Sequence, residues 1–356
     1  MKKLLTLILC AVMALSFAAC GAGAASTAPV TSAASASTSE KAEELPTFGV
    51  IIFDYANDYC YHVRNGMTKA SEGIATLEMV DSQNDQAKQT DQVDTLINKG
   101  VSGLLIAIVD PEAAPTIIDK CRAADIPVIF VNRRPDLEAI ASYEKCWYVG
   151  AATAQPGEAQ AQMVLDDWAA HPEFDKNKDG VMQYIVVKGE NGHANAEARC
   201  TGIEKIFDAA NFKRELLDMQ PGGWNAAAAK NLMETWYGKF GNEIECILSN
   251  NDAMALGIIE ALKAEGYFTG DKGMPIYGIN AIPEGLDALE DKTLMGTVMS
   301  DMISEGACTF QLAYNFVKGQ DVMTDVNYKM DENKCVAIEG LPIRVDNIAT
   351  ARAMYE

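Results

Sequence analysis

The stretch that decides the fold is residues 103–131, GLLIAIVDPEAAPTIIDKCRAADIPVIFV. It begins with an apolar run at 103–109, continues with a helical pattern at 111–124 and ends with a second apolar run at 127–131. Short apolar runs separated by a helix are typical of parallel strands in a sheet that helices cover on both faces. The stretch therefore predicts a strand–helix–strand unit of an α/β fold.

The same alternation continues on both sides of this stretch, from Phe48 onward. Further strands are predicted at 48–53, 75–80, 146–149, 182–187, 244–248, 275–279 and 295–299. Further helices are predicted at 84–99, 154–170, 195–210, 225–240, 251–265 and 301–318. Roughly 310 residues are more than one hydrophobic core usually supports, so we expect two parallel-sheet domains.

Polar side chains follow several of the predicted strands. They lie at 54–59, at 188–193, at 249–252 and at Asn280. Ligands of open parallel sheets bind beyond the carboxyl ends of the strands, so these segments are the candidate binding residues.

Charge and motif content exclude several functions. The net charge of −21 argues against a nucleic-acid partner. The sequence contains no phosphate-binding loop, dinucleotide-binding glycine motif or nucleophile elbow, and its three histidines have no metal-binding spacing. No catalytic constellation is visible, so we expect a protein that is not an enzyme.

The N-terminus predicts export. Lys2 and Lys3 precede an apolar run from Leu4 to Ala19, which fits a signal peptide over residues 1–19. The run closes on FAAC, and small residues before Cys20 resemble the lipobox of bacterial lipoproteins, in which that cysteine is lipidated. The alternative is an ordinary Ala-x-Ala cleavage site next to an unrelated cysteine.

Residues 20–45 are rich in Ala, Ser and Thr and predict a disordered tether. No later segment is long and apolar enough to span a bilayer, so we expect an extracytoplasmic protein that meets the membrane only through its lipid anchor. The cysteines after the tether are odd in number and form no CxxC pair, which predicts free thiols at Cys60, Cys121, Cys146, Cys200, Cys246, Cys308 and Cys335.

A calcium-type loop is the most specific local motif. Residues 175–183, DKNKDGVMQ, place oxygen-bearing side chains at alternate positions and glycine at the sixth. An EF-hand would supply glutamate at the twelfth position, where this chain has Val186. From the motif alone, a calcium loop and a polar turn both remain open.

Three strings carry a family resemblance: VDSQNDQ at 80–86, KGENGHANAEAR at 188–199 and SNNDAMA at 249–255. They resemble, in this order, the bacterial periplasmic galactose/glucose-binding proteins, which are sugar-binding components of ABC importers with the type I periplasmic binding fold. The similarity runs from about Phe48 to Asp346. It implies two Rossmann-like parallel-sheet domains joined by a three-segment hinge.

The resemblance also implies domain limits. The expected N-terminal domain comprises 46–127 and 302–338, and the expected C-terminal domain comprises 128–301 and 339–356. The chain should cross between the domains near 126–129, 299–302 and 338–342.

For the calcium loop, the resemblance supplies the missing ligand as Glu245, within Ile244-Glu245-Cys246. The implied structural Ca²⁺ ligands are the side chains of Asp175, Asn177, Asp179 and Gln183, the carbonyl of Val181 and both oxygens of Glu245.

For the sugar site, the resemblance implies that two aromatic rings, Tyr59 and Trp224, enclose the ligand, because the C–H faces of a sugar pack on flat π-systems. The other implied ligand-binding residues are Asn57, His193, Asn195, Arg199, Asn251, Asn280 and Ser300.

This chain departs from the family pattern in the same site. Asn57, Asn195 and Asn280 stand where the family has aspartate, and Ala107 and Ser300 stand where it has asparagine. Amides both donate and accept hydrogen bonds whereas carboxylates only accept, so the ligand should differ from glucose or galactose. A neutral altered monosaccharide and a sugar bearing its own anion, such as a uronic acid, both stay open.

The resemblance implies a monomeric substrate-binding lipoprotein that delivers a monosaccharide to an ABC permease in the membrane. The alternative is a sensor, whose ligand-bound form is recognised by a chemoreceptor or a sensor-kinase ectodomain, since both functions use the same closure of two domains.

Overall fold

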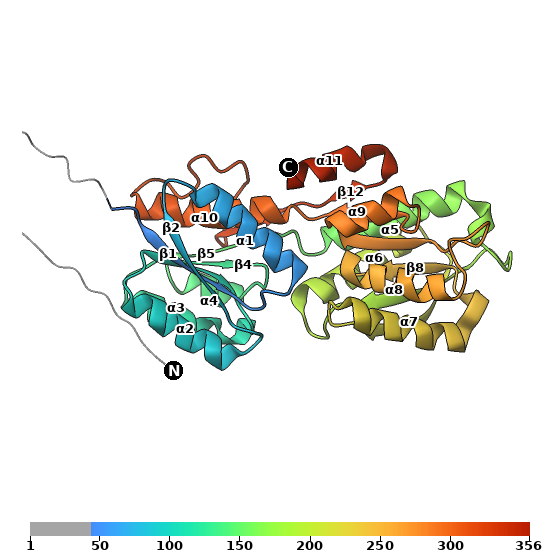
Figure 1. The fold of residues 1–356 in the computed structure, drawn as a ribbon, viewed down its shortest axis with the longest axis horizontal. Helices are drawn as coiled ribbons and strands as arrows, with labels where there is room; N and C mark the ends of the chain where they lie inside the picture. The colour runs from blue at the N-terminus through green and yellow to red at the C-terminus, as the bar shows by residue number, and fades with distance from the viewer. Residues whose placement is uncertain (1–43) are drawn as a thin grey trace, which may run out of the picture. The chain divides into compact units, whose positions relative to one another are not determined.

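The computed structural model describes residues 44–356, so the predicted signal peptide, Cys20 and nearly all of the predicted tether lie outside the described residues. Within 44–356 the chain forms two lobes, each built on a six-stranded sheet with helices packed against it (Figure 1). None of the helices in this range combines the length and the hydrophobicity needed to cross a membrane.

The first lobe contains a fully parallel sheet with the strand order β11-β5-β4-β3-β1-β2. Its strands are β1 (Thr47–Ile52), β2 (Thr76–Asp81), β3 (Gly103–Ala107), β4 (Val128–Val131), β5 (Cys146–Ala151) and β11 (Cys335–Ile338). Its helices are α1 (Asp58–Ser71), α2 (Gln86–Asn98), α3 (Ala114–Ala123), preceded by the 3₁₀ helix η1 (Pro111–Ala113), α4 (Leu137–Ala141) and α10 (Met302–Val317). Val50 and Ile52 pack into one core and Ile51 into another, so both faces of β1 are buried, which explains its continuous apolar run.

The second lobe contains a sheet with the order β12-β10-β9-β8-β6-β7, in which β12 is antiparallel to β10 and the other pairs are parallel. Its strands are β6 (Met182–Lys188), β7 (Arg214–Pro221), β8 (Cys246–Ser249), β9 (Ile276–Asn280), β10 (Gly296–Met299) and β12 (Leu341–Ile343). Its helices are α5 (Gln155–Ala170), α6 (Ala194–Ala209), α7 (Ala226–Phe240), α8 (Asp252–Ala264), α9 (Pro283–Glu290) and α11 (Ile348–Arg352). Short 3₁₀ helices are η2 (Pro172–Phe174), η3 (Gly241–Glu243), η4 (Val345–Asn347) and η5 (Ala353–Tyr355).

The two sheets confirm the predicted α/β class but move one domain limit. Strand β4 pairs with both β3 and β5, so the first lobe extends through Ala151. The predicted limit between 127 and 128 and the predicted crossing near 126–129 are therefore wrong, because the parallel register of β3 continues directly into β4 and β5. The other two crossings lie between β10 and α10 and between β11 and β12, where they were predicted.

Each predicted strand has its counterpart in the two sheets, whereas β7, β11 and β12 were not predicted. All three lie at sheet edges. Strand β7 is half-exposed over most of its length and has no continuous apolar run, whereas β11 and β12 are only four and three residues long. Helices α1, α4, α9 and α11 were also missed. The sequence of α1, DYCYHVRNGMTKAS, is largely polar and gives only a weak helical pattern.

The seven cysteines of the described residues are free and buried, as predicted. Burial raises the pKa of the thiols at Cys121, Cys146 and Cys308 to about 12, so they remain protonated and pack as small apolar side chains.

Candidate functional site

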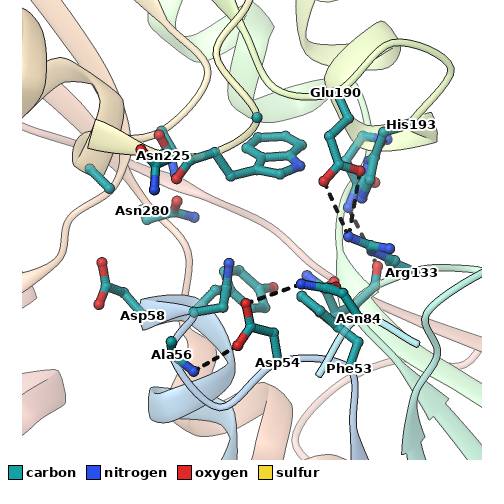
Figure 2. Close-up of a pocket in the computed structure, with 18 of the residues that line it drawn as sticks. Phe53, Asp54, Ala56, Asp58, Asn84, Arg133, Glu190, His193, Asn225 and Asn280 are labelled. Carbon is teal, nitrogen blue, oxygen red and sulfur yellow. Dashed lines mark hydrogen bonds and ion pairs between the residues drawn. The ribbon is translucent and has the colours of Figure 1, made fainter. Parts of the chain in front are cut away.

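A cavity of about 330 Å³ lies between the two lobes, beyond the carboxyl ends of the strands (Figure 2). Its lining comprises Phe53, Asp54, Ala56, Asn57, Asp58, Tyr59, Asn84, Asn132 and Arg133 from the first lobe and Glu190, His193, Asn195, Arg199, Gly223, Trp224, Asn225, Ala226, Asn251, Ala253, Asn280 and Ile282 from the second. This is the size of pocket that encloses a small organic ligand.

Eight of the nine ligand-binding residues expected from the family resemblance line this cavity, and Ser300 does not. Ser300 lies behind the wall, where its hydroxyl accepts a hydrogen bond from Asn280 Nδ2 at 3.1 Å. Ala107, at another departure from the family pattern, is fully buried away from the lining.

Four lining residues also cap the N-termini of helices. Asn57 accepts from a backbone N–H at the start of α1, His193 at α6, Asn225 at α7 and Asn251 at α8. In each of the four caps the side chain uses its acceptor atom for the helix, so the N–H groups of the same side chain are the ones that can donate to a ligand. Four helices of more than a dozen residues each therefore point their positive ends at the cleft.

His193 is neutral and acts as a hydrogen-bond donor. Its Nδ1 accepts from the backbone N–H of Asn195 at 3.2 Å, so the ring proton lies on Nε2. Burial, followed by the nearby cations Arg133 and Arg199, lowers the pKa of His193 to about 4. The imidazole therefore stays uncharged at neutral pH.

On the second lobe, Trp224 is fixed by its backbone and by one glycine. Its φ of 60° is in the left-handed region that few non-glycine residues adopt. A Cβ on Gly189 would lie 2.2 Å from the indole ring, so only glycine admits the ring here. The ring of His193 meets the indole edge-on, with centroids 5.1 Å apart.

On the first lobe, Tyr59 is fixed by a buried acid. Its hydroxyl donates a short hydrogen bond to Oε2 of Glu305, on α10. Glu305 is 0 % exposed, and its other oxygen has no hydrogen-bond partner among residues 44–356. Burial raises the pKa of Glu305 to about 8, so the carboxyl is mostly protonated at neutral pH. Nothing in the local sequence of α10 indicates this role.

Arg199 lies on α6, and close helix packing sets its position. A Cβ on Gly157 would lie 2.0 Å from the carbonyl oxygen of Arg199, so α5 and α6 meet closely at this residue. Its Nη1 donates to the carbonyl oxygen of Asn250. The side chain is only 4 % exposed.

A buried carboxylate holds the loop that carries Asn280. Asn280 and Ala281 have φ values of 116° and 55°. Asp252 accepts from the N–H of Ile282 at 3.1 Å and from the hydroxyl of Thr297 at 2.7 Å. These bonds fix a backbone conformation that costs free energy on its own.

Two contacts join the lobes across the cleft. Arg133 Nη2 lies 3.4 Å from Oε1 of Glu190 (Figure 2). Asn195 Nδ2 donates to the carbonyl oxygen of Asn132 at 3.4 Å. Sequence reasoning did not single out Arg133 or Asn132. Both directly follow β4, so the rule that ligands bind beyond the carboxyl ends of strands could have found them.

The calcium-type loop lies away from the cleft, before β6. Its backbone N–H groups at Asp179, Gly180 and Val181 donate to side-chain oxygens of Asp175, Asn177 and Asp179, so the loop wraps around its own oxygens.

Glu245 closes the loop from outside. It is 1 % exposed and accepts from the backbone N–H groups of Lys176, at 2.6 Å, and Gln183, at 3.3 Å, which lie on either side of the loop. Burial raises the pKa of its carboxyl. Within 44–356 no three His, Cys, Asp or Glu side chains form a metal-binding group by themselves, so a cation here would also need amide and carbonyl oxygens.

Comparisons with known proteins agree with this architecture. Residues 48–321 match the family described as "Periplasmic binding protein domain". The D-galactose/methyl-galactoside binding periplasmic protein of Haemophilus influenzae is 38 % identical over 303 residues, which cover 84 % of this chain and 90 % of that protein. The xylitol-binding protein of Mycolicibacterium smegmatis is 26 % identical, over 83 % of this chain and 80 % of that protein.

A solved ABC transporter solute-binding protein from Bacillus halodurans with bound myo-inositol superposes with a TM-score of 0.73 at 25 % identity, covering 87 % of this chain and 98 % of that one. The family match spans most of both lobes, and the Haemophilus protein is similar along nearly its whole length. The chain therefore belongs to the periplasmic binding protein family.

Proposed function

We propose that this chain is the extracytoplasmic substrate-binding protein of an ABC importer and that it binds one monosaccharide in the cleft. The observation that carries the proposal is the pair of anchored aromatic residues, Tyr59 on one lobe and Trp224 on the other, both in the lining of one cavity. Flat rings pack against the C–H faces of a sugar. Hydroxyl groups would meet the side-chain donors of Asn57, His193 and Asn251.

The two contacts that join the lobes support binding by closure. A ligand that touches both walls favours the closed form by the difference in its affinity for the two forms. The closed form would then be the species that a permease recognises. The named ligands of the relatives, galactosides, xylitol and myo-inositol, are small polyols, which agrees with this ligand class.

A thermal-shift survey against hexoses, pentoses, deoxysugars, polyols and acidic sugars tests the proposal. A ligand at about a hundredfold excess over its Kd adds about 2.7 kcal/mol of stability. We expect one class of monosaccharide to raise the Tm. Tyr59→Ala should abolish the shift, whereas Tyr61→Ala, at a side chain that is 52 % exposed, should retain it. A survey in which no monosaccharide raises the Tm would contradict the proposal.

We also propose that the loop at 175–183, together with Glu245, binds a structural Ca²⁺ ion. Three carboxylates, two amides and one carbonyl make up the proposed ligands, and Ca²⁺ prefers such oxygen ligands. The residues fit the ion because the loop already gathers its oxygens inward and because Glu245 is a buried carboxylate with no cationic side chain in ion-pair contact within the described residues. When bound, the ion would hold the loop against the start of β8.

The lipid anchor is likewise a proposal, supported by the sequence FAAC at 17–20. The protein expressed in a bacterial host should fractionate with membranes and incorporate a labelled fatty acid. Cys20→Ser should lose the label and be released from the membrane. Label retained by the variant would show that Cys20 is not the lipidated residue.

A further inference from the structure

Two arginines line the cleft from opposite lobes. Arg133 follows β4 in the first lobe, and its side chain is 11 % exposed. Arg199 lies on α6 in the second lobe and is 4 % exposed. Each guanidinium lies over an aromatic ring of the same lining, Arg133 at 4.3 Å from the centroid of Phe53 and Arg199 at 5.7 Å from that of Trp224.

The described residues do not fully neutralise the positive charge of either arginine. Arg133 donates to the carbonyl oxygen of Val109 and reaches Glu190 only at 3.4 Å, through a carboxylate that is 42 % exposed. Arg199 donates to a carbonyl oxygen and forms no ion pair with any carboxylate of residues 44–356. The Nε atom of each arginine is buried and has no hydrogen-bond partner in the described part of the chain.

The buried acids near Arg199 neutralise its charge only in part, and neither forms an ion pair with it within residues 44–356. Burial raises the pKa of Glu305 to about 8, so this carboxyl is mostly uncharged at neutral pH. Burial raises the pKa of Asp252 to about 6, so this carboxylate is mostly charged at neutral pH, but its oxygens accept from Thr297 and from the backbone of Ile282. The pKa of His193 is lowered to about 4 first by burial and then by the positive charges of Arg133 and Arg199, so both arginines act on this ring.

The other acids of the lining are either exposed or engaged within the first lobe. Asp58 is exposed, at the start of α1. Asp54 accepts from the N–H of Ala56 at 2.9 Å and from the side chain of Asn84 at 3.1 Å, so its oxygens are engaged within the first lobe (Figure 2). Among the charged side chains that line the cleft, Arg199 is buried and Arg133 nearly so, whereas Asp58 is exposed and the side chain of Glu190 is 42 % exposed.

An arginine cannot discard its proton, and a buried charge without a partner is unfavourable. We propose that the ligand is an anionic monosaccharide whose charged group, a carboxylate or a phosphate, binds between Arg133 and Arg199 beside His193. This inference rests on the proposed function and narrows its ligand class. The N-terminus of α6, which His193 caps, adds a further positive end at the same place.

Matched ligand pairs test the inference by isothermal titration. The pairs are D-galacturonate with D-galactose, D-glucuronate with D-glucose, and D-galactose 6-phosphate with D-galactose. We expect at least one anionic sugar to bind roughly tenfold or more tightly than its neutral partner, since hydrogen bonds to charged groups are the stronger ones. The uronates and the phosphate distinguish the two kinds of anion.

Variants show whether the preference comes from the arginines. Arg133→Gln should reduce the ratio of anionic to neutral affinity about tenfold, and Arg133→Lys should retain part of it. Arg122→Gln is the matched control, because Arg122 lies on α3 at the surface and pairs with Asp119. With the unaltered protein, added salt should weaken binding of the anionic sugar more than that of its neutral partner.

Neutral sugars that bind as tightly as, or more tightly than, every anionic partner would overturn this inference and leave the proposed function intact. An unchanged ratio in Arg133→Gln would overturn it as well. If neither the anionic sugars nor any neutral monosaccharide binds, both the inference and the proposed function fail.

Discussion

The two walls of the cleft hold their aromatic rings by different means. On the first lobe, Tyr59 depends on Glu305, which lies 246 residues later in the chain. On the second lobe, Trp224 depends on its own left-handed backbone and on Gly189, at the end of β6. The first wall is therefore set by one buried titratable pair, and the second by backbone geometry and helix caps.

The calcium-type loop connects to the second wall only. Glu245 and Gln183 pair through a backbone hydrogen bond of 2.9 Å at the start of β8 and β6. At their other ends these strands lead to Asn251 and to Gly189, in or beside the cleft lining. A cation in the loop would thus tie together two strands that carry the second wall, without touching the first.

The largest expected effect is the pH dependence that Glu305, behind the first wall, gives to the free energy of unfolding. The pKa of Glu305 is raised from 4.5 to about 8, so its contribution to stability is complete below about pH 4.5 and is lost as pH rises through 8. Glu305→Gln keeps the shape of the protonated acid. Between pH 4.5 and 8 the unaltered protein should lose on the order of 4 kcal/mol of unfolding free energy relative to the variant, measured by urea unfolding. If the free energy of unfolding had the same pH dependence in both proteins, Glu305 would not be a buried acid with a raised pKa.

The next effect concerns the loop beneath the second wall. Calcium at about a hundredfold excess over its Kd should stabilise the protein by about 2.7 kcal/mol, and a chelator should reverse this. Glu245→Gln should lose most of the response in a thermal melt. Glu243→Gln, at an exposed carboxylate two residues earlier, should keep it. An equal response in both variants would remove Glu245 from the proposed ligands.

His193 gives the second wall a pH dependence of the opposite sign. Its pKa is lowered from 6.5 to about 4, so its contribution is present above about pH 6.5 and is lost as pH falls through 4. His193→Asn retains the helix cap and does not titrate. Between about pH 7 and 5 the unaltered protein should lose about 2 kcal/mol more unfolding free energy than the variant. Equal losses in urea unfolding would show that His193 is not held neutral by burial and by the two arginines.

The smallest effect concerns the fit of Trp224 alone. Gly189→Ala places a methyl group 2.2 Å from the indole position and must displace the ring. Affinity for the monosaccharide with the largest thermal shift should fall about tenfold, near 1.4 kcal/mol. Gly238→Ala is the control, because a Cβ there meets nothing within 4 Å. Unchanged affinity in Gly189→Ala would mean that Trp224 does not contact the ligand.

The difference in how the two walls are held also explains which parts of the fold and of the site could be predicted from the sequence. The second wall follows strands with long apolar runs, and its His193 and Asn251 lie in local strings that mark helix starts and family resemblance alike. The fold class follows from the same runs. Edge strands such as β7 were missed because a half-exposed strand has no continuous apolar pattern.

The anchoring of the first wall was not predictable in this way. Glu305 lies inside a helix, where a glutamate usually faces solvent, and its burial depends on packing between α1 and α10, which are far apart in sequence. Arg133 follows β4 and could have been identified as a residue beyond the carboxyl end of a strand. The predicted domain limit before β4 instead placed it in the wrong domain. The calcium site remains a prediction, because the loop geometry agrees with it without testing it.

The most direct test of the account is a crystal structure of the protein with its tightest-binding monosaccharide. The account predicts one sugar ring between Tyr59 and Trp224, with His193 and Arg199 within hydrogen-bonding distance of its oxygens. A ligand bound outside the cavity between the lobes, or one that touches only one of the two walls, would contradict it.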